Sequence, residues 1–191
     1  MNKFLLIAFF LTIAQATSLK GSEVPSFVEV KYITNAGSGC SPSSMNATVD
    51  TSAVTILHPS IIVTMGSGIP LTESRKNCQI NFQLQYEKGW QYRLSNFKNI
   101  GSYNMEESIF SSFKVTQYAA GQLQYVTVED TYKPGTADYI FDKTFAPSFL
   151  WSNCQQNYST NLNSQGIRNS GQLTVGKDNV LFSLGLEWRR C

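Results

Sequence analysis

Residues 74–86 constrain the fold more than any other part of the chain. From residue 79 onward, apolar side chains alternate with amide side chains. The apolar set is Ile80, Phe82, Leu84 and Tyr86, and the amide set is Gln79, Asn81, Gln83 and Gln85. Successive side chains of a β-strand point to opposite faces, so this pattern predicts a strand with one face in a core and the other in water.

The next segment has a similar pattern. Trp90, Tyr92 and Leu94 alternate with polar residues, and a short turn at residues 87–89 separates them from the first strand. The pair predicts a β-hairpin with an aromatic inner face.

Further segments rich in β-branched and aromatic residues, bounded by turn signals, predict more strands. They are residues 27–34, 46–49, 53–57, 60–65, 97–103, 107–118, 123–131, 139–145, 173–175 and 181–188. Segments 46–49 and 53–57 form an expected short hairpin, and 173–175 and 181–188 an expected final one. Residues 159–167 are polar and weakly patterned. We predict an all-β, single-domain antiparallel β-sandwich of about ten short strands, with a jelly-roll or barrel-like fold as the alternative.

The N-terminus has the features of a secretory signal. Lys3 precedes an apolar run at residues 4–14, and Ala14-Gln15-Ala16 fits the small-residue rule for signal peptidase. The run is too short to span a bilayer comfortably. We expect a signal peptide at residues 1–16 and one domain at residues 17–191. The mature chain should lack a membrane span and be secreted or extracellular, with the periplasm or the cell surface as alternatives.

The four cysteines all lie in the expected mature part. An even number in an exported chain indicates disulfides, and four cysteines allow three connectivities. Pairing Cys40 with Cys78 and Cys154 with Cys191 gives two local, unthreaded loops, and this arrangement is favoured. The closely spaced Cys or His pairs of a zinc site are missing from the sequence, and His58 is its one histidine. We therefore expect no metal and no cofactor.

The overall charge excludes one class of partner. The chain of 191 residues has a formal net charge of +2, and 15% of its residues are charged. This near-neutral balance gives no electrostatic basis for binding nucleic acid.

Several short motifs carry a family resemblance. They are Gly37-Ser38-Gly39-Cys40, Ser74-Arg75-Lys76-Asn77-Cys78-Gln79, Gly89-Trp90-Gln91-Tyr92, Trp151-Ser152-Asn153-Cys154 and Leu186-Glu187-Trp188-Arg189-Arg190-Cys191. In order and spacing, the chain resembles the secreted "domain of unknown function 4360" family along nearly the whole mature part. It departs at Asn153 and Gln155, where relatives often carry proline and glycine. The resemblance implies a small exported β-rich protein with four paired cysteines, and it brings no activity.

The sequence offers little for catalysis. His58 precedes Pro59 at an expected strand boundary, and the cysteines are expected to be oxidised, so a His-dependent or thiolate nucleophile is disfavoured. A glycosidase needs two carboxylates flanking the bond. The candidate acids are Glu106, Glu107, Glu129, Asp130, Asp138 and Asp142. Adjacent residues in a strand face opposite ways, so a catalytic pair would have to form between strands. We name no catalytic residue, and the balance favours a protein that is not an enzyme.

Two readings of the motif Ser74, Arg75, Lys76 and Asn77 remain open. Its cations and amide could clamp a carboxylate or sulfate. They could instead fix the strand entry and build a turn beside the disulfide, which is the favoured reading. Trp90, Trp151 and Trp188 fit a core, whereas an exposed aromatic row would suggest a sugar-binding platform. Asn46 and Asn157 begin N-glycosylation sequons.

The first functional hypothesis is a non-catalytic binding or surface-interaction module, for example for a cell-wall or host glycan. The alternatives are a secreted hydrolase that uses two carboxylates and a structural or inhibitory protein that acts on another secreted protein.

Overall fold

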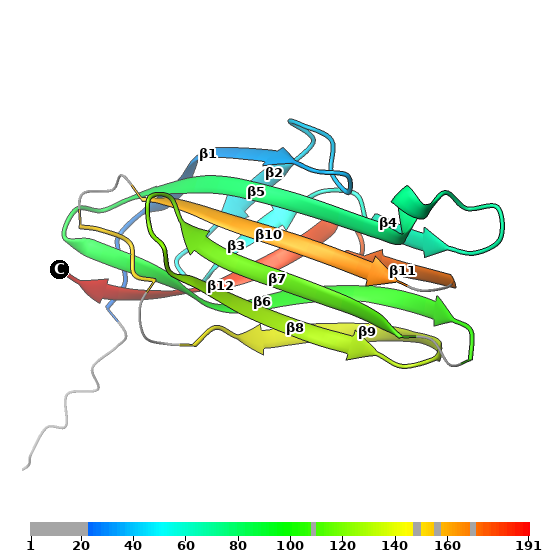
Figure 1. The fold of residues 1–191 in the computed structure, drawn as a ribbon. Coiled ribbons are helices and arrows are strands. Elements are labelled where there is room, and N and C mark those ends of the chain that lie inside the picture. The colour runs from blue at the N-terminus through cyan, green and yellow to red at the C-terminus, as the bar shows by residue number, and fades with distance from the viewer. Residues whose placement is uncertain (1–22, 108–109, 147–149, 155–157, 169–170) are drawn as a thin grey trace, which may run out of the picture.

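The alternating patterns build a β-rich fold, which the computed structural model describes for residues 23–107, 110–146, 150–154, 158–168 and 171–191. The expected signal peptide, residues 1–16, lies outside these ranges. The strands in the described part are β1 (Val28–Ala36), β2 (Asn46–Val49), β3 (Ala53–Leu57), β4 (Ile61–Met65), β5 (Arg75–Tyr86), β6 (Trp90–Met105), β7 (Ser111–Ala119), β8 (Tyr125–Tyr132), β9 (Gly135–Thr144), β10 (Ser159–Arg168), β11 (Gly171–Val175) and β12 (Val180–Arg190). A 3₁₀ turn, η1 (Leu71–Ser74), precedes β5 (Figure 1).

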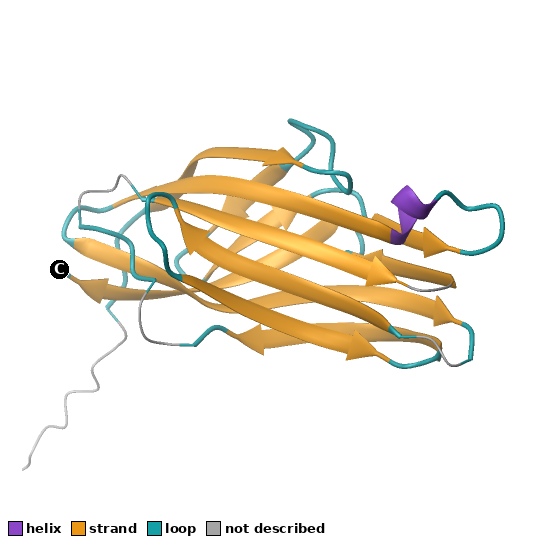
Figure 2. Ribbon diagram, viewed as in Figure 1, coloured by secondary structure: helices purple, strands orange, loops and turns teal. Residues whose placement is uncertain are grey.

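Two antiparallel sheets pack face to face (Figure 2). The five-stranded sheet has the order β1-β5-β10-β7-β8. The seven-stranded sheet has the order β2-β3-β12-β6-β11-β4, with β9 paired to the other edge of β6. The predicted all-β sandwich is confirmed, and it is an open sandwich rather than a closed barrel. Within the described residues, no helix is long and apolar enough to cross a membrane.

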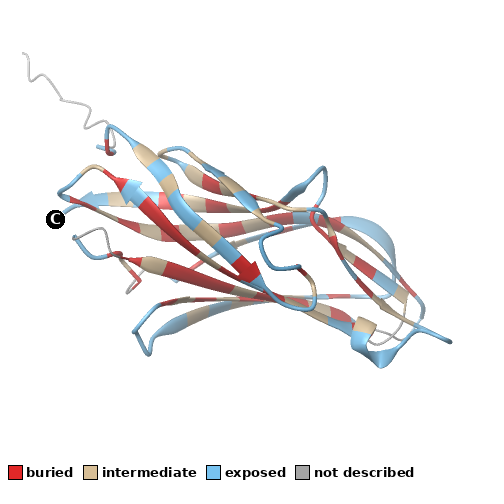
Figure 3. Cartoon of the chain, turned by 90° about the horizontal axis from the view of Figure 1, so that it is seen from above, coloured by how far each residue is buried: buried red, intermediate tan, exposed pale blue. Residues whose placement is uncertain are grey.

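The core lies between the sheets, and along most strands buried positions alternate with more exposed ones (Figure 3). Its centre is a cluster of four phenylalanine rings. Phe113 comes from the five-stranded sheet, and Phe97, Phe141 and Phe182 come from the other sheet. Their ring centroids are 4.7–6.3 Å apart. Aromatic burial on this scale supplies much of the free energy that holds the two sheets together.

Strand β5 has the predicted two faces. Ile80 and Phe82 are fully buried, and Leu84 and Tyr86 are each 1% exposed. The amide side chains point away from the core, although neighbouring side chains cover Gln83.

The predicted hairpin between residues 79–86 and 90–94 is wrong. Strand β5 pairs with β1 and β10, whereas β6 pairs with β12, β9 and β11. The turn at Gly89, which has φ 85°, carries the chain from one sheet to the other. Both strands still face the same core from opposite sides, with the Tyr86 and Tyr92 rings 5.5 Å apart. A sheet-to-sheet crossing therefore produces the same alternation as a hairpin.

The two other predicted hairpins have different outcomes. Strands β2 and β3 pair as expected, and Asp50 Oδ1 closes their turn by accepting from Ser52 N at 2.7 Å and Ala53 N at 3.0 Å. The expected final hairpin is wrong, because β11 and β12 lie end to end along the same edge of β6. Gly101 pairs with Val175, and Lys98 pairs with Ser183.

Strand β10, which the sequence did not predict, lies between β5 and β7 in the five-stranded sheet. Its inward positions include Leu162, Ser164 and Gly166, a small and mostly non-hydrophobic set. A Cβ on Gly166 would stand 2.9 Å from Val63 Cγ2 in the opposite sheet. The inner face of β10 is thus small because the sheets approach closely there, and this conceals the usual apolar alternation.

Candidate functional site

The motif before Cys78 is occupied by contacts within the chain. Ser74 Oγ donates to Leu71 O at 2.6 Å, and Lys76 Nζ pairs with Glu73 Oε1 at 2.7 Å. Arg75 donates through Nε and Nη2 to the side-chain oxygen of Gln165, with that amide in the orientation that satisfies both groups. Residues 74–77 line none of the four pockets described below.

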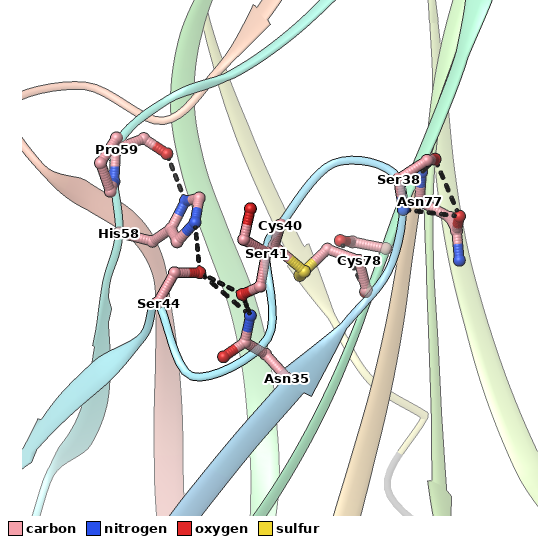
Figure 4. Close-up of a disulfide and its surroundings, with 10 residues drawn as sticks. Asn35, Ser38, Cys40, Ser41, Ser44, His58, Pro59, Asn77 and Cys78 are labelled. Atoms are coloured by element: carbon pink, nitrogen blue, oxygen red, sulfur yellow. Dashed lines mark hydrogen bonds between the residues drawn. A yellow bond between two sulfur atoms is a disulfide. The ribbon is translucent and has the colours of Figure 1, made fainter. Parts of the chain in front are cut away.

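Asn77 holds the glycine-rich loop that carries Cys40 (Figure 4). Its Oδ1 accepts from Ser38 Oγ at 3.1 Å, and Ser38 Oγ accepts from Asn77 N at 3.1 Å. Gly39 N donates to Asn77 O at 2.8 Å. These bonds lay the loop along β5, where Cys40 forms a buried disulfide with Cys78.

The second disulfide joins Cys154 to Cys191. Beside it, the half-buried Trp151 ring lies against the guanidinium groups of Arg93 and Arg189, at 5.4 Å and 4.2 Å from the ring centroid. The other two tryptophans pack in or against the core. Trp90 is 1% exposed, and partly buried Trp188 donates Nε1 to Thr51 O at 2.7 Å. The tryptophans therefore form no exposed row.

The candidate catalytic groups are dispersed. His58 Nε2 lies 3.0 Å from Ser44 Oγ in the loop that follows Cys40 (Figure 4). Asp130 pairs with Lys143 at 3.1 Å, and Asp142 accepts from Asn96 Nδ2 at 3.0 Å. Each of the four described pockets is lined by at most one carboxylate. Among the described residues, no three His, Cys, Asp or Glu side chains cluster as metal ligands would.

The two sequons have different positions. Asn46 is the exposed first residue of β2. Asn157 lies outside the described residues.

The outer face of the five-stranded sheet carries neutral hydrogen-bonding side chains on adjoining strands. We call it the amide face. Strand pairing aligns these side chains in two transverse rows, each crossing the strands. The first row is Thr34, Asn81, Asn161, Tyr118 and Tyr125, from β1, β5, β10, β7 and β8 respectively. The second row is Gln79, Asn163, Thr116 and Thr127.

Hydrogen bonds fix Asn81, Asn161 and Gln79 in place. Asn81 Nδ2 donates to Asn161 Oδ1 and to Ser159 Oγ, both at 2.7 Å. Gln79 Nε2 donates to Tyr118 Oη at 2.7 Å, which ties the second row to the first. Side chains held this way lose little conformational entropy when a ligand binds.

A tyrosine pair ends the first row at β8. Tyr118 and Tyr125 are directly opposite each other, and Tyr125 is 66% exposed. They adjoin a pocket of about 390 Å³ formed with the hairpin tip between β7 and β8. Leu123, at that tip, is 99% exposed. The row thus ends in exposed aromatic and aliphatic surface beside amide groups.

Asn163 Oδ1, in the second row, is buried and has no hydrogen-bond partner among the described residues. Burying a carbonyl without a partner costs stability. This part of the face is therefore not optimised for the stability of the isolated fold.

Charged side chains lie toward both ends of the amide face, with exposed Glu29 opposite outward-facing Gln85 at one end. Lys114 and Glu129 are paired in register beyond the second row. The two rows themselves contain no charged side chain. They present hydroxyl groups, amide groups and aromatic rings to a neutral ligand.

The outer face of the seven-stranded sheet differs. Its largest described pocket, about 440 Å³, is lined by Lys98, Lys177 and Asp178 together with Ile100 and Val180, and it has no aromatic side chain. Smaller pockets of about 210 Å³ and 340 Å³ lie over β6 and β11. The amide face combines fixed amides with the exposed ring of Tyr125.

The sequence did not single out Asn161, Asn163, Tyr118 or Tyr125. One signal could have found two of them. Asn161, Asn163 and Gln165 occupy alternate positions, as the amides of β5 do. Two segments with amides at a spacing of two residues indicate neighbouring strands that share a polar face.

Comparison with known proteins gives a family and a relative. The family model described as "Domain of unknown function (DUF4360)" matches residues 26–191. An "Uncharacterized secreted protein" of Arthroderma benhamiae is 30% identical over 145 residues, which cover 74% of this chain. The match covers 59% of the length of that relative.

Two solved structures are similar at low scores. One is the enzymatically active domain of tailspike protein 4 of bacteriophage CBA120, with TM-score 0.33 and 10% identity over 83% of this chain and 19% of that one. The other is TmCBM61 in complex with beta-1,4-galactotriose, with TM-score 0.27 and 8% identity over 85% of this chain and 91% of that one. Similarities of this size carry no conclusion about function.

Proposed function

Since the chain belongs to the DUF4360 family, whose description names no activity, its function has to be inferred from its own surface, and we propose that it is a secreted, non-catalytic protein that binds neutral glycans on the amide face. The observation that carries this proposal is the first row, in which fixed amides lead to a tyrosine pair whose outer member, Tyr125, is 66% exposed.

Secretion is supported by two observations. The relative from Arthroderma benhamiae is named a secreted protein. Two disulfides link four cysteines, and such bonds persist in oxidising compartments.

The chemistry of the amide face fits a sugar. Each pyranose carries hydroxyl groups that both donate and accept, and Asn and Gln amides have one acceptor and two donor hydrogens each. Asn81 and Asn161 are already held by hydrogen bonds, so they are positioned before a ligand arrives. The C–H faces of a sugar ring are apolar and pack on aromatic rings, for which the exposed ring of Tyr125 is available.

The absence of charge from the two rows supports a neutral glycan over a uronate or sulfated one. A polyanion would be recognised through arginine and lysine side chains, which hold carboxylate and sulfate groups by charge-assisted hydrogen bonds. The nearest cation in register, Lys114, faces Glu129 on the next strand.

The test is retention on insoluble polysaccharides, together with a glycan array. The secreted protein is incubated with cellulose, chitin, xylan and β-1,3-glucan, and with polygalacturonate as the acidic comparison. We expect retention on at least one neutral polymer, and loss of most of it in Tyr125→Ala. Ile140→Ala is the matched control, because Ile140 has the same 66% exposure and lies on the other sheet.

Two results would overturn the proposal. One is no retention on any polymer combined with an empty array. The other is equal retention of Tyr125→Ala and the unmodified protein. Capture of a defined secreted protein without any glycan would favour the structural or inhibitory alternative instead.

A further inference from the structure

We propose that the ligand of the amide face is a single extended glycan chain that crosses the strands, with about one sugar per strand and its strongest subsite at the Tyr118–Tyr125 end. This inference rests on the proposed function and adds the direction, length and polarity of the site.

The direction follows from the strand register. Thr34 pairs with Asn81, Asn81 with Asn161, Asn161 with Tyr118, and Tyr118 with Tyr125. The first row therefore runs perpendicular to the strands. Neighbouring strands are about 4.8 Å apart, so the five positions span about 19 Å.

The spacing suits a polysaccharide. An extended chain of equatorially linked pyranoses advances by one ring per sugar, a repeat close to the strand spacing of about 4.8 Å. A chain laid along the first row would therefore meet one equivalent side chain per sugar. Along a strand the repeat is two residues, about 7 Å, which has no such match.

The second row gives this path a second side. It lies two residues along each strand from the first, about 7 Å away, and the Gln79–Tyr118 hydrogen bond of 2.7 Å bridges the two rows. Gln79 and Thr127 of this row are exposed and can meet ligand hydroxyl groups, whereas Asn163 Oδ1 is buried.

The tyrosine end supplies the anchor. Leu123 and Tyr125 flank the pocket of about 390 Å³. The rest of its lining is Thr116, Tyr118, Gln122 and Gln124. A sugar bound here would cover the exposed apolar side chains with the C–H face of its ring. Its hydroxyl groups would bond to the neighbouring amides. The opposite end of the row, at exposed Thr34 on the edge strand β1, has Tyr32 two residues away at 38% exposure, against 66% for Tyr125, and should bind more weakly.

Sheet twist further restricts the ligand. Adjacent strands are rotated by about 20–25°, so a row across five strands is not flat. A single chain in solution can follow such a row, whereas the flat surface of a crystalline polymer cannot. The inference therefore predicts binding of soluble oligosaccharides.

The experiment is calorimetric titration with β-1,4-linked gluco-, xylo- and N-acetylglucosamine oligosaccharides of two to seven sugars. We expect one series to bind with an affinity that rises to four or five sugars and then stays constant. Tyr125→Ala should weaken every length by tenfold or more. Thr34→Ala should weaken only oligomers of five or more sugars, and Ile140→Ala should change nothing.

The possible failures are distinguishable. Retention on a polysaccharide without binding of any soluble oligomer would overturn the single-chain inference and leave the proposed function standing. An affinity that does not depend on oligomer length, or one that still rises at seven sugars, would also overturn the single-chain inference and leave the proposed function standing. No binding to any glycan, soluble or insoluble, would overturn both.

Discussion

Gly37 lies against the backbone of Asn77 so closely that a Cβ on Gly37 would stand 2.2 Å from the Asn77 carbonyl oxygen. The two motifs that stood out most in the sequence, one ending at Cys40 and the other at Cys78, are therefore in direct contact. Gly37 also has φ 151°, a conformation that L-residues rarely adopt.

Gly37→Ala should destabilise the fold by about 3 kcal/mol, because the methyl group meets rigid backbone and the dihedral is unfavourable. Chemical denaturation measures the effect. Gly66→Ala is the control, since a Cβ there meets nothing within 4 Å. Equal stabilities for the two variants would show that the loop does not depend on this contact.

Replacing Cys40 and Cys78 together by serine should reduce the free energy of unfolding by about 4 kcal/mol, because the unfolded chain loses a covalent constraint. The double variant avoids leaving a free thiol. Thermal unfolding under oxidising conditions measures the loss. A reducing agent should lower the melting temperature of the unmodified protein, whereas the variant should have a lower melting temperature without any reducing agent.

Arg75→Ala should lower stability by about 1 kcal/mol, through the lost hydrogen bonds to Gln165, and leave glycan retention unchanged. Denaturation and the polysaccharide assay are run on the same preparation. An unchanged melting temperature with lost retention would indicate that the motif at residues 74–77 binds the ligand.

Alkaline pH should destabilise the protein through its buried tyrosines. Burial raises the pKa of Tyr158 to about 12, and burial also raises the pKa of Tyr92. Between pH 10 and about 12 the unfolded chain ionises these groups and the folded protein keeps them neutral, so stability falls as pH rises. The contribution of these neutral, buried tyrosines to stability is fully present below pH 10.

Melting temperature measured from pH 8 to 12 checks this, and Tyr158→Phe should show a smaller decline. A melting temperature that stays constant up to pH 12 would contradict the assignment.

Asn163→Val should raise stability by about 1 kcal/mol, because it removes a buried acceptor without a partner and adds a β-branched residue to a strand. Asn161→Val is the matched comparison. It deletes an oxygen that accepts from Asn81 Nδ2, so it should be destabilising. The reverse order of the two variants would contradict the assigned bonding.

The sequence predicted those parts of the fold in which local pattern and environment agree. The alternation of β5 identified its buried and outer faces because every inward position is a large apolar side chain. The Asp50 turn identified the β2–β3 hairpin because its hydrogen bonds are local.

Pairing between sheets was not predictable in the same way. Tyr86 and Tyr92 face each other across the core, and the same alternation would arise if their strands were hydrogen-bonded neighbours. Strand β10 escaped detection because its inner face is reduced to residues such as Ser164 and Gly166 where the sheets approach. The amide face depends on β10, so its central residues could not be grouped before the topology was known.

The position of β10 also determines the order in which the molecule can assemble. Both of its neighbours, β5 and β7, precede it in the chain by dozens of residues, and neither pairs with the other. Until residue 168 is available, these two strands have unsatisfied edges, and closing such distant pairings is slow. The first row is complete only when β10 lies between β5 and β7, so a chain in which β10 has not yet paired cannot present the whole row to a ligand.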